Sequence, residues 1–573
     1  MKEGFRQSMA WLHTWSGLLV GWVLFMVFAT GTSAYFRDEI SHWMKPELHG
    51  APAASQVAPA QAAGQAVRFL EREAAGSPRW NIGLPSDRES DVRVTWTRPQ
   101  PPGAPRQRLL AVPLDPATGE RLAAPRATRG GDFFYRMHFD LHYMPALWAR
   151  WIVGFCAMFM LVAIVSGIVT HRRIFSDFFT FRPRKGQRSW LDAHNATAVL
   201  ALPYHLMITY TGLVTLMFMY MPWAAQTAYQ GDQKTFFAEA FPNAAGSAPQ
   251  KAAGRPAALV PLGPLVEQAQ ARWQGAAASR AVVTFPGDAN AAVTVYRDGQ
   301  ASLSSNQASV VFNGTTGQLL ETRGEAVPPA SETRGVFVGL HVGHFAGPVL
   351  RWLFFLSGLA GCVMVATGLL MWAVKERQKY AKALAKGGRI GFGLRLVDGL
   401  NLGAIAGLPL AMASFFWANR LIPVATPDRP AAEIAAFFTV WGVATVAGIA
   451  WPARRMWQVQ LALGGLLFAL VPVMNPLTGG AGLVAAATAG HWSLVGFDAT
   501  CLLLGVALLA SAWWLGRRKP AARAGTAPRP ARAGQPAQPA APAPQSHPHP
   551  AGEPGLSPAR HSLAAAAAEG SSP

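Results

Sequence analysis

The chain has 573 residues, of which 51% are hydrophobic and only 14% charged, and this composition excludes an ordinary soluble protein. Its formal net charge of +20 would suit nucleic acid, but the basic residues gather in loops that connect apolar segments. We therefore expect membrane lipid as a partner and no nucleic acid. The three cysteines, Cys156, Cys362 and Cys501, fall within apolar segments, which predicts packing residues rather than disulfides or metal ligands.

Eight apolar segments are long enough to span a membrane. They cover residues 9–36, 149–170, 193–221, 350–372, 399–417, 433–451, 457–474 and 493–515. Basic clusters follow the second, fourth, sixth and eighth segments, and the positive-inside rule makes that side cytoplasmic. We expect a bacterial inner (cytoplasmic) membrane protein with both termini in the cytoplasm, whose first span is retained rather than cleaved.

The spans divide the chain into eight regions. In order, these are the N-terminus with span one (1–36), a first extracytoplasmic domain (37–148), spans two and three with a basic loop (149–221), a second extracytoplasmic domain (222–349), span four (350–372), a basic cytoplasmic loop (373–398), spans five to eight (399–515) and a cytoplasmic Ala/Pro-rich tail (516–573). The tail has almost no large apolar residues, and we expect it to be disordered.

The two extracytoplasmic segments contain the same motifs in the same order. In the first, alternation at 92–96 predicts a half-buried strand, and a second strand at 109–114 runs into a tight turn. In the second, the first strand recurs at 293–296, and the strand with its turn recurs at 310–318. The repetition predicts two α+β domains of one kind.

The membrane spans are duplicated as well, and the repeated units carry histidines. His13 precedes Gly31 by 18 positions, and His194 precedes Gly212 by the same 18. Each unit also ends alike, with Leu141-His142, Arg150-Trp151 and Ser166-Gly167 in the first copy and Leu340-His341, Arg351-Trp352 and Thr367-Gly368 in the second. Histidines at matching depths of duplicated membrane helices are the main indication of function.

Ionisable side chains inside a membrane are costly and usually functional. By topology they form two layers: near the cytoplasmic face are His13, His171 and His194, and near the opposite face are His142 and His341, with His138 and His344 close by. A single interfacial histidine such as His138 could equally be a structural helix cap, whereas the whole duplicated set favours ligands. Paired imidazoles across a helix bundle suit haem iron. Zinc fits less well, since no cysteine or carboxylate cluster accompanies them.

We predict two b-type haems, one near each face, because the Cys-x-x-Cys-His motif of covalent haem attachment is absent. The candidate ligands are His13, His171 and His194 for the cytoplasmic haem, and His142 and His341, with His344 in reserve, for the other. His205 follows His194 by eleven residues, about three turns plus roughly 20°, so both would face one way, about 16 Å apart. The partner of His205 stays open, and Pro203 is expected to bend this helix.

Three charged residues have two interpretations each. Arg150 and Arg351 stand at equivalent span ends, where they could pair with haem propionates or snorkel beside interfacial Trp. Asp498, inside span eight, could serve a proton or quinone reaction, although a structural hydrogen bond is the favoured interpretation.

The arrangement resembles the PepSY-associated transmembrane family, also called iron-regulated membrane proteins, over about residues 5–380. The resemblance is carried by Leu12-His13, Thr30-Gly31, the Asp115-Pro116-Ala117-Thr118-Gly119 turn, Leu141-His142, Ser166-Gly167, His171-Arg172-Arg173-Ile174-Phe175, His194, His205 and Leu340-His341. Trp372 stands where the repeat would place a second His171, and the last four spans lie outside the shared core. The resemblance implies PepSY-like extracytoplasmic domains and a haem-containing reductase of ferric siderophores.

The expected fold is a mainly α integral membrane protein, with a duplicated four-helix haem-binding bundle, two extracytoplasmic α+β (PepSY-like) insertions and about four additional C-terminal spans. The predicted function is a membrane haem-dependent ferric (siderophore) reductase. Electrons from a cytoplasmic donor or membrane quinol would reach a periplasmic ferric chelate or siderophore. One alternative is a PepSY-type binding or regulatory protein without redox activity, in which the histidines are structural. A transporter built from spans five to eight is the least favoured hypothesis.

Overall fold

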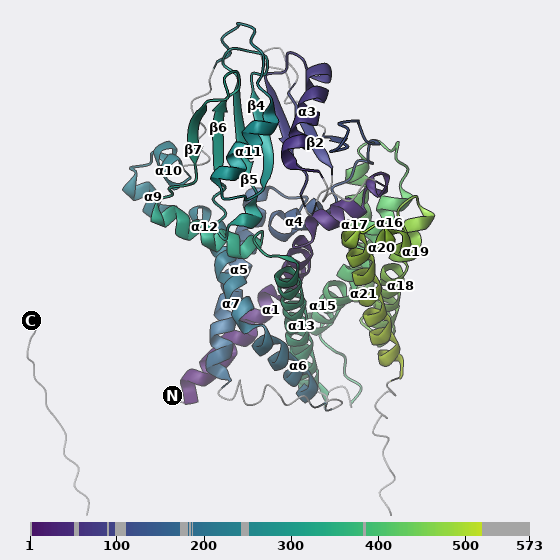
Figure 1. Cartoon of the computed structure of the whole chain (residues 1–573). Helices are drawn as coiled ribbons and strands as arrows, with labels where there is room; N and C mark the ends of the chain where they lie inside the picture. Colours follow the sequence, from purple (N-terminus) through teal and green to yellow (C-terminus); the bar gives the residue numbers. More distant parts are fainter. Residues whose placement is uncertain are drawn as a thin grey trace, which may run out of the picture. The chain divides into compact units, whose positions relative to one another are not determined.

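Long apolar helices and one antiparallel β-sheet make up the described part of the chain (Figure 1). The computed structural model describes residues 3–50, 57–86, 88, 91–97, 111–171, 182, 185, 187–241, 251–381 and 386–517. The tail that we expect to be disordered, beyond residue 517, and the first residues of the strand predicted at 109–114 lie outside the described residues.

Membrane-spanning helices account for the apolar segments. Six helices of the described residues are long and apolar enough to cross a membrane, and two bent helix pairs raise the number to up to eight. The six are α1 (Glu3–Ala34), α5 (Ala146–Thr170), α13 (Pro348–Lys379), the continuous α15, η4 and α16 (Phe392–Leu402, Gly403–Gly407, Leu408–Leu421), α17 (Arg429–Ala450) and α21 (Trp492–Arg517). The pairs are α6 with α7 (Gln187–Leu200, Leu202–Thr215) and α18 with α19 (Arg454–Ala469, Val471–Leu477). The prediction of a multi-pass membrane protein is confirmed.

The third predicted span is broken close to Pro203. Helices α6 and α7 are bent by 69° across Ala201. Pro203 lies in the first turn of α7, where its missing N–H leaves no helical hydrogen bond unmade. The prediction that His194 and His205 face the same way on one helix was therefore wrong, because a count of turns does not carry across a bend.

The spans pack as two groups. Helices α1, α5, α6, α7 and α13 pack with the short helices α4 (Gly131–Asp140) and α12 (Pro329–Val342), and we call this group the histidine bundle. Helices α15 to α21, including α20 (Leu483–Thr488), form the second group, the C-terminal bundle. The C-terminal bundle has a core rich in phenylalanine that includes Phe415, Phe416 and Phe437.

The segments 37–148 and 222–349, which the sequence predicted to be two extracytoplasmic domains, share one sheet instead of forming two separate ones. The seven strands run in the order β3-β2-β1-β4-β5-β6-β7, so three strands of the first segment continue into four of the second. The strands are β1 (Arg79–Gly83), β2 (Val92–Trp96), β3 (Val112–Leu114), β4 (Ala278–Thr284), β5 (Ala292–Arg297), β6 (Ser309–Asn313) and β7 (Leu319–Arg323). Strands β2, β3, β5 and β6 match the sequence predictions, whereas β1, β4 and β7 were not predicted.

Short helices complete the sheet and its connections. They are α2 (Arg37–Trp43), η1 (Pro46–Leu48), α3 (Pro59–Glu73), α8 (Met217–Tyr220), α9 (Trp223–Ala228), α10 (Gln233–Ala240), α11 (Leu262–Arg272) and η3 (Gly299–Ala301). Helices α3 and α11 pack against each other and against the sheet. Their buried residues, such as Leu70 and Val266, share one hydrophobic core with Ile82 and Val293 of the strands.

The junction between β1 and β4 explains why the duplication produces a single sheet. The two strands are antiparallel, and Asn81 lies opposite Val282. These residues are equivalent in the repeat, since Pro85 and Pro286 each follow four positions later. Equivalent residues that face each other define a pseudo-twofold axis between the two halves of the chain.

Replacing Ile82 by Ala tests whether the two segments fold as one unit. Ile82 is fully buried in β1, beside β4, and its truncation should cost roughly 2–5 kcal/mol of unfolding free energy. Because the core is shared, we expect faster amide hydrogen exchange in β4 and β5 as well as in β1 to β3, measured by mass spectrometry. Asn81→Ala, at a half-buried neighbouring position, is the control. Faster exchange confined to β1–β3 would contradict a shared core.

Candidate functional site

One pair of histidines lies toward the end of α1 that is remote from the sheet. His13 of α1 and His194 of α6 have ring centroids 6.2 Å apart. Nδ1 of His13 is 2.8 Å from the carbonyl oxygen of Ala163 in α5. Nδ1 of His194 is 2.8 Å from the carbonyl oxygen of Met364 in α13. We call His13 and His194 the distal pair.

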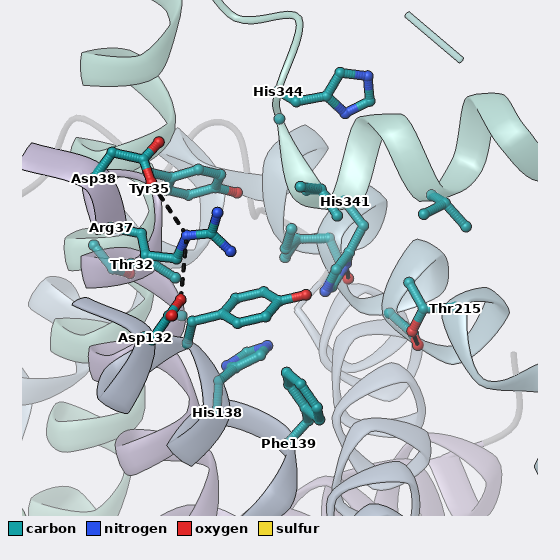
Figure 2. A pocket seen from close by; sticks show the side chains of 18 of the residues that line it. Thr32, Tyr35, Arg37, Asp38, Asp132, His138, Phe139, Thr215, His341 and His344 are labelled. Carbon is teal, nitrogen blue, oxygen red and sulfur yellow. Dashed lines mark hydrogen bonds and ion pairs between the residues drawn. The ribbon is translucent and has the colours of Figure 1, made fainter. Parts of the chain in front are cut away.

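A second pair lies toward the sheet. His138 of α4 and His341 of α12 have ring centroids 6.1 Å apart, and Figure 2 shows both rings in one pocket. Nδ1 of His138 is 2.8 Å from the carbonyl oxygen of Val27, and Nδ1 of His341 is 3.0 Å from that of Ile208. We call His138 and His341 the proximal pair.

All four histidines are seated alike, each against a glycine of a neighbouring span. The carbonyl that accepts each Nδ1–H lies four residues, about one helical turn, before the glycine. A Cβ on that glycine would fall 2.6 to 3.3 Å from the ring. The combinations are His13 with Gly167, His194 with Gly368, His138 with Gly31, and His341 with Gly212. The repeated Ser/Thr-Gly motifs are thus histidine seats, because a residue without a side chain lets the imidazole approach the helix backbone.

The seats determine which ring nitrogen carries the proton. A carbonyl oxygen only accepts, so Nδ1 holds the hydrogen, and in the neutral ring Nε2 is a bare lone pair. Among the described residues, no hydrogen bond reaches Nε2 of these four rings. Burial, with a smaller contribution from His138, lowers the pKa of His341 to about 3, and burial also lowers the pKa of His138. The proximal rings are therefore neutral near pH 7.

The distance between the ring centroids of each pair matches that of two ligands on opposite sides of one metal. With metal–imidazole bonds of about 2.0–2.1 Å, two coaxial rings have centroids roughly 6 Å apart, as in both pairs. No group of three or more His, Cys, Asp or Glu residues suited to a metal ion occurs within the described ranges. A metal that needs only two protein ligands, such as the iron of a haem, therefore fits these residues, whereas a structural zinc ion does not.

A cavity of about 920 Å³ opens at the proximal pair and extends toward the sheet. This volume lies in the range of ligand pockets, about 300–1,000 Å³. Its charged side chains include Arg37, which lies between Asp38 and Asp132 with nitrogen–oxygen distances of 3.3 and 3.5 Å (Figure 2). On another wall, the hydroxyls of Tyr35 and Tyr204 are 3.0 Å apart. The cavity therefore brings the proximal imidazoles together with charged and hydroxyl side chains.

His142, a candidate ligand for the same haem as His341, does not lie beside His341. Helix α4 ends at Asp140, and Leu141, His142 and Tyr143 all have positive φ, so the chain turns sharply before α5. The ring of His142 stacks on Phe438 of α17, with centroids 5.6 Å apart. His138 is the histidine that the structure brings to His341.

The other predicted ligands occupy separate positions. Nε2 of His171 accepts a hydrogen bond from Nδ2 of Asn195 at 2.8 Å. His205 is 1% exposed, donates from Nε2 to the carbonyl of Ser357 at 3.3 Å, and leaves Nδ1 buried without a partner in the described part of the chain. His344 lines the cavity beside Gly299. None of these three rings stacks or pairs with another histidine among the described residues.

Arg150 and Arg351 already have carboxylate partners in the chain. Nε of Arg150 is 2.8 Å from Asp140, and Nη1 of Arg351 is 2.8 Å from Glu39. Both arginines also line the cavity. These ion pairs join residues that are distant in sequence or lie across a turn, and neither the propionate nor the snorkelling interpretation anticipated them.

Sequence reasoning missed His138 as a pair member, although a signal was present. Phe134 precedes His138 by four positions, and Phe337 precedes His341 by four. This helical spacing aligns α4 with α12. The Leu-His dipeptide at His142 is a weaker match to Leu340-His341, because α4 ends at Asp140, before this dipeptide begins.

A third histidine pair, also missed from the sequence, is different in kind. His42 of α2 and His49 stack with centroids 5.4 Å apart and planes at 27°. Both nitrogens of His49 are used, since Nε2 donates to the carbonyl of His42 at 3.2 Å and Nδ1 accepts from the backbone N–H of Ala481 at 3.1 Å. This pair connects the segment between α1 and α5 to the C-terminal bundle and leaves no bare nitrogen on His49. Asp498 is likewise a structural acceptor, 2.8 Å from Nε1 of Trp43.

Two comparisons with known proteins bear on this site. Residues 10–375 match the sequence model of the PepSY-associated TM region. An uncharacterized protein of Pseudomonas aeruginosa is 27% identical over 400 residues, which cover 64% of this chain and 91% of that protein. The matched region 10–375 contains both histidine pairs and all four glycine seats.

The His42–His49 contact predicts a pH-dependent stability. Burial lowers the pKa of His42 to about 4 and that of His49 to about 3, whereas both are about 6.5 in an unfolded chain. Between the folded and unfolded pKa values, the folded state binds fewer protons than the unfolded state. The contribution of these two histidines to the free energy of unfolding is therefore constant above about pH 6.5 and falls as the pH decreases from 6.5 toward 4. We expect the Tm of the detergent-solubilised protein to fall between about pH 7 and pH 5. The fall should be smaller in the double variant His42→Phe, His49→Gln, and equal slopes would contradict this attribution.

Proposed function

The chain belongs to the PepSY-associated transmembrane family, and we propose that it is a two-haem electron-transfer protein of the bacterial inner membrane. The observation that carries this proposal is the repeated pair of carbonyl-anchored histidines with ring centroids 6.1 and 6.2 Å apart. Haem iron held between two imidazoles supplies reversible one-electron chemistry. A hydrogen bond from Nδ1–H to a carbonyl fixes the ring orientation and makes Nε2 a stronger ligand.

The positions of the two pairs suit transfer across a membrane. His13 and Gly31, the seat of His138, are 18 residues apart on α1, which is about 27 Å along the helix. A hydrocarbon core is about 30 Å thick, so one pair lies near each face. With the basic loops in the cytoplasm, the distal pair would hold a haem that could accept electrons from a cytoplasmic donor or membrane quinol, and the proximal pair would hold a haem on the periplasmic side.

The cavity above the proximal pair is where we propose that the acceptor binds. The acceptor class is Fe(III) held by a siderophore or a similar chelate. Arg37, Arg88 and Arg93 line the cavity, each in an ion pair with a carboxylate of the chain. The lining as a whole has more basic than acidic side chains, which favours an anionic chelate. One electron converts Fe(III) to Fe(II), which many ferric chelators hold less tightly, so iron is released while the chelator stays intact.

Haem content of single variants tests the assignment of ligands. We expect purified wild-type protein to contain two haems per chain, and His138→Ala or His341→Ala to lose about one of them. His142→Phe is the matched control and should keep both, because it removes the imidazole but keeps an aromatic ring against Phe438, and His142 is not part of the proximal pair. The measurement is the Soret and α-band absorbance per protein after reduction. A wild-type protein without a Soret band would refute the proposal and favour a binding or regulatory role. Loss of a haem in His142→Phe alone would refute the pairing.

Reoxidation by ferric chelates tests the direction of transfer. Protein that has been reduced with dithionite should be reoxidised when a ferric chelate is added without oxygen, and Fe(II) should appear in equal amount. His13→Ala should leave the proximal site able to react, whereas His138→Ala should slow reoxidation at least tenfold. Stopped-flow absorbance in detergent follows the reaction. Equal rates in wild type and His138→Ala would contradict electron delivery through the proximal pair.

A further inference from the structure

The C-terminal bundle begins at Phe392, beyond the residues 10–375 that match the family. It nevertheless shares a hydrophobic core with α4, the helix that carries His138. Phe133, Phe134 and Met137 of α4 are 0–3% exposed and belong to the same cluster as the phenylalanines of α16 and α17. An element outside the duplicated unit therefore packs beside one ligand of the proximal pair.

Aromatic rings make up most of this contact. The ring of Phe133 is 4.9 Å from that of Phe415 and 5.0 Å from that of Phe437. The ring of Phe134 is 5.3 Å from that of Phe415 and 5.9 Å from that of Phe416. Such edge-to-face and tilted pairs add about 0.5–1.5 kcal/mol each to the free energy of burial. Helix α4 has only ten residues, fewer than the roughly 12–15 that an isolated helix needs, so it depends on tertiary packing. The aromatic contacts add the C-terminal bundle to its neighbours α1, α2 and α5.

A polar clamp holds the residues that enter α4. The hydroxyl of Thr128 donates to Glu433 of α17 at 2.6 Å and accepts the backbone N–H of Gly130 at 3.0 Å. Glu433 is fully buried and also pairs with Arg429, whose Nη1 donates to the carbonyl of Ala127 at 3.0 Å. Loss of any partner would leave the buried carboxylate of Glu433 incompletely paired, which is destabilising. Thr128 and Arg429 are therefore held in place against Glu433. It fixes the chain three residues before α4 begins.

The residues that leave α4 also depend on the C-terminal bundle. Leu141, His142 and Tyr143 have φ values of 52°, 51° and 36°, which is unfavourable for residues other than glycine. The rings of His142 and Tyr143 lie 5.6 and 4.9 Å from Phe438. Packing against α17 therefore offsets the cost of this turn, and both ends of α4 are held by the same bundle.

We propose that the C-terminal bundle positions His138, and so sets the ligand geometry of the proximal site while leaving the distal site unaffected. The proposal rests on the proposed function only in that the proximal pair binds haem. Glu433, Thr128 and Phe415 act as positioning residues through α4. The carbonyls that anchor the distal pair belong to Ala163 of α5 and Met364 of α13, and they do not contact these positioning residues. A ligand must be held within about 0.5 Å of its working position, so release of α4 loosens one iron–imidazole bond.

The test uses full-length Glu433→Gln, Thr128→Val and Phe415→Ala variants. We expect each to convert part of the proximal haem from six-coordinate low-spin to five-coordinate, so that its reduced form binds carbon monoxide, which the wild type does not. The distal haem should keep its spectrum and midpoint potential. Thr128→Ser, which retains the hydroxyl, should restore wild-type behaviour. His341→Ala, which should lack the proximal haem, shows the spectrum of the distal haem by itself.

Leu461→Ala is the matched control, because Leu461 lies in a separate buried cluster of the C-terminal bundle with Ala406 and Ala512. It should lower thermal stability without carbon monoxide binding. Hydrogen exchange of residues 131–140 is a second readout that needs no haem, and it should rise in the three variants but not in Leu461→Ala. Unchanged proximal spectra and unchanged α4 exchange in all three variants would overturn the proposal. If wild-type protein holds no haem, the proposed function fails, and the exchange measurement still decides whether the bundle positions α4.

Discussion

The hydrogen bond from a histidine Nδ1 to a helix carbonyl, made over a glycine, is the interaction on which the histidine bundle depends. It occurs four times, and each time the glycine lies one turn after the accepting carbonyl. The bond fixes ring orientation, proton position and the direction of Nε2 together. The buried imidazole of His49, which meets no such glycine among the described residues, uses both of its nitrogens in hydrogen bonds instead. Because the seats leave Nε2 bare, the pairs are suited to bind a metal centre.

Duplication turns these seats into two sites. His13 and His194 are equivalent residues of the repeat, and they face each other, as Asn81 and Val282 do in the sheet. The halves of the chain are therefore joined by equivalent contacts in the spans and in the sheet. The symmetry is broken at the proximal end, where the cavity lies. There the C-terminal bundle packs against α4, whereas α12, the equivalent helix of the second half, packs against α7. Under the proposed function, these different surroundings would give electron transfer between the two pairs a direction.

The sequence predicted those features that depend on local pattern or on the repeat. Periodicity and spacing predict the spans and the strands at 92–96 and 293–296. They also place His13 and His194 in the same layer. The choice between His138 and His142 does not follow from them. It depends on where α4 ends, and that end is set by a left-handed turn of non-glycine residues that Phe438 stabilises from a distant helix. The partners of Arg150 and Arg351 and the joining of two segments through β1 and β4 are likewise tertiary contacts without a local signal.

Imaging the purified protein by cryo-electron microscopy would test the central claim most directly, at a resolution that shows side chains. We expect a flat, haem-sized density between His13 and His194 and another between His138 and His341, each joined to both Nε2 atoms. Nδ1 of every ring should remain within hydrogen-bond distance of its carbonyl, at Ala163, Met364, Val27 and Ile208. Histidine pairs with no density between them, or rings turned so that Nε2 bonds to the backbone, would contradict the assignment of these pairs as haem ligands.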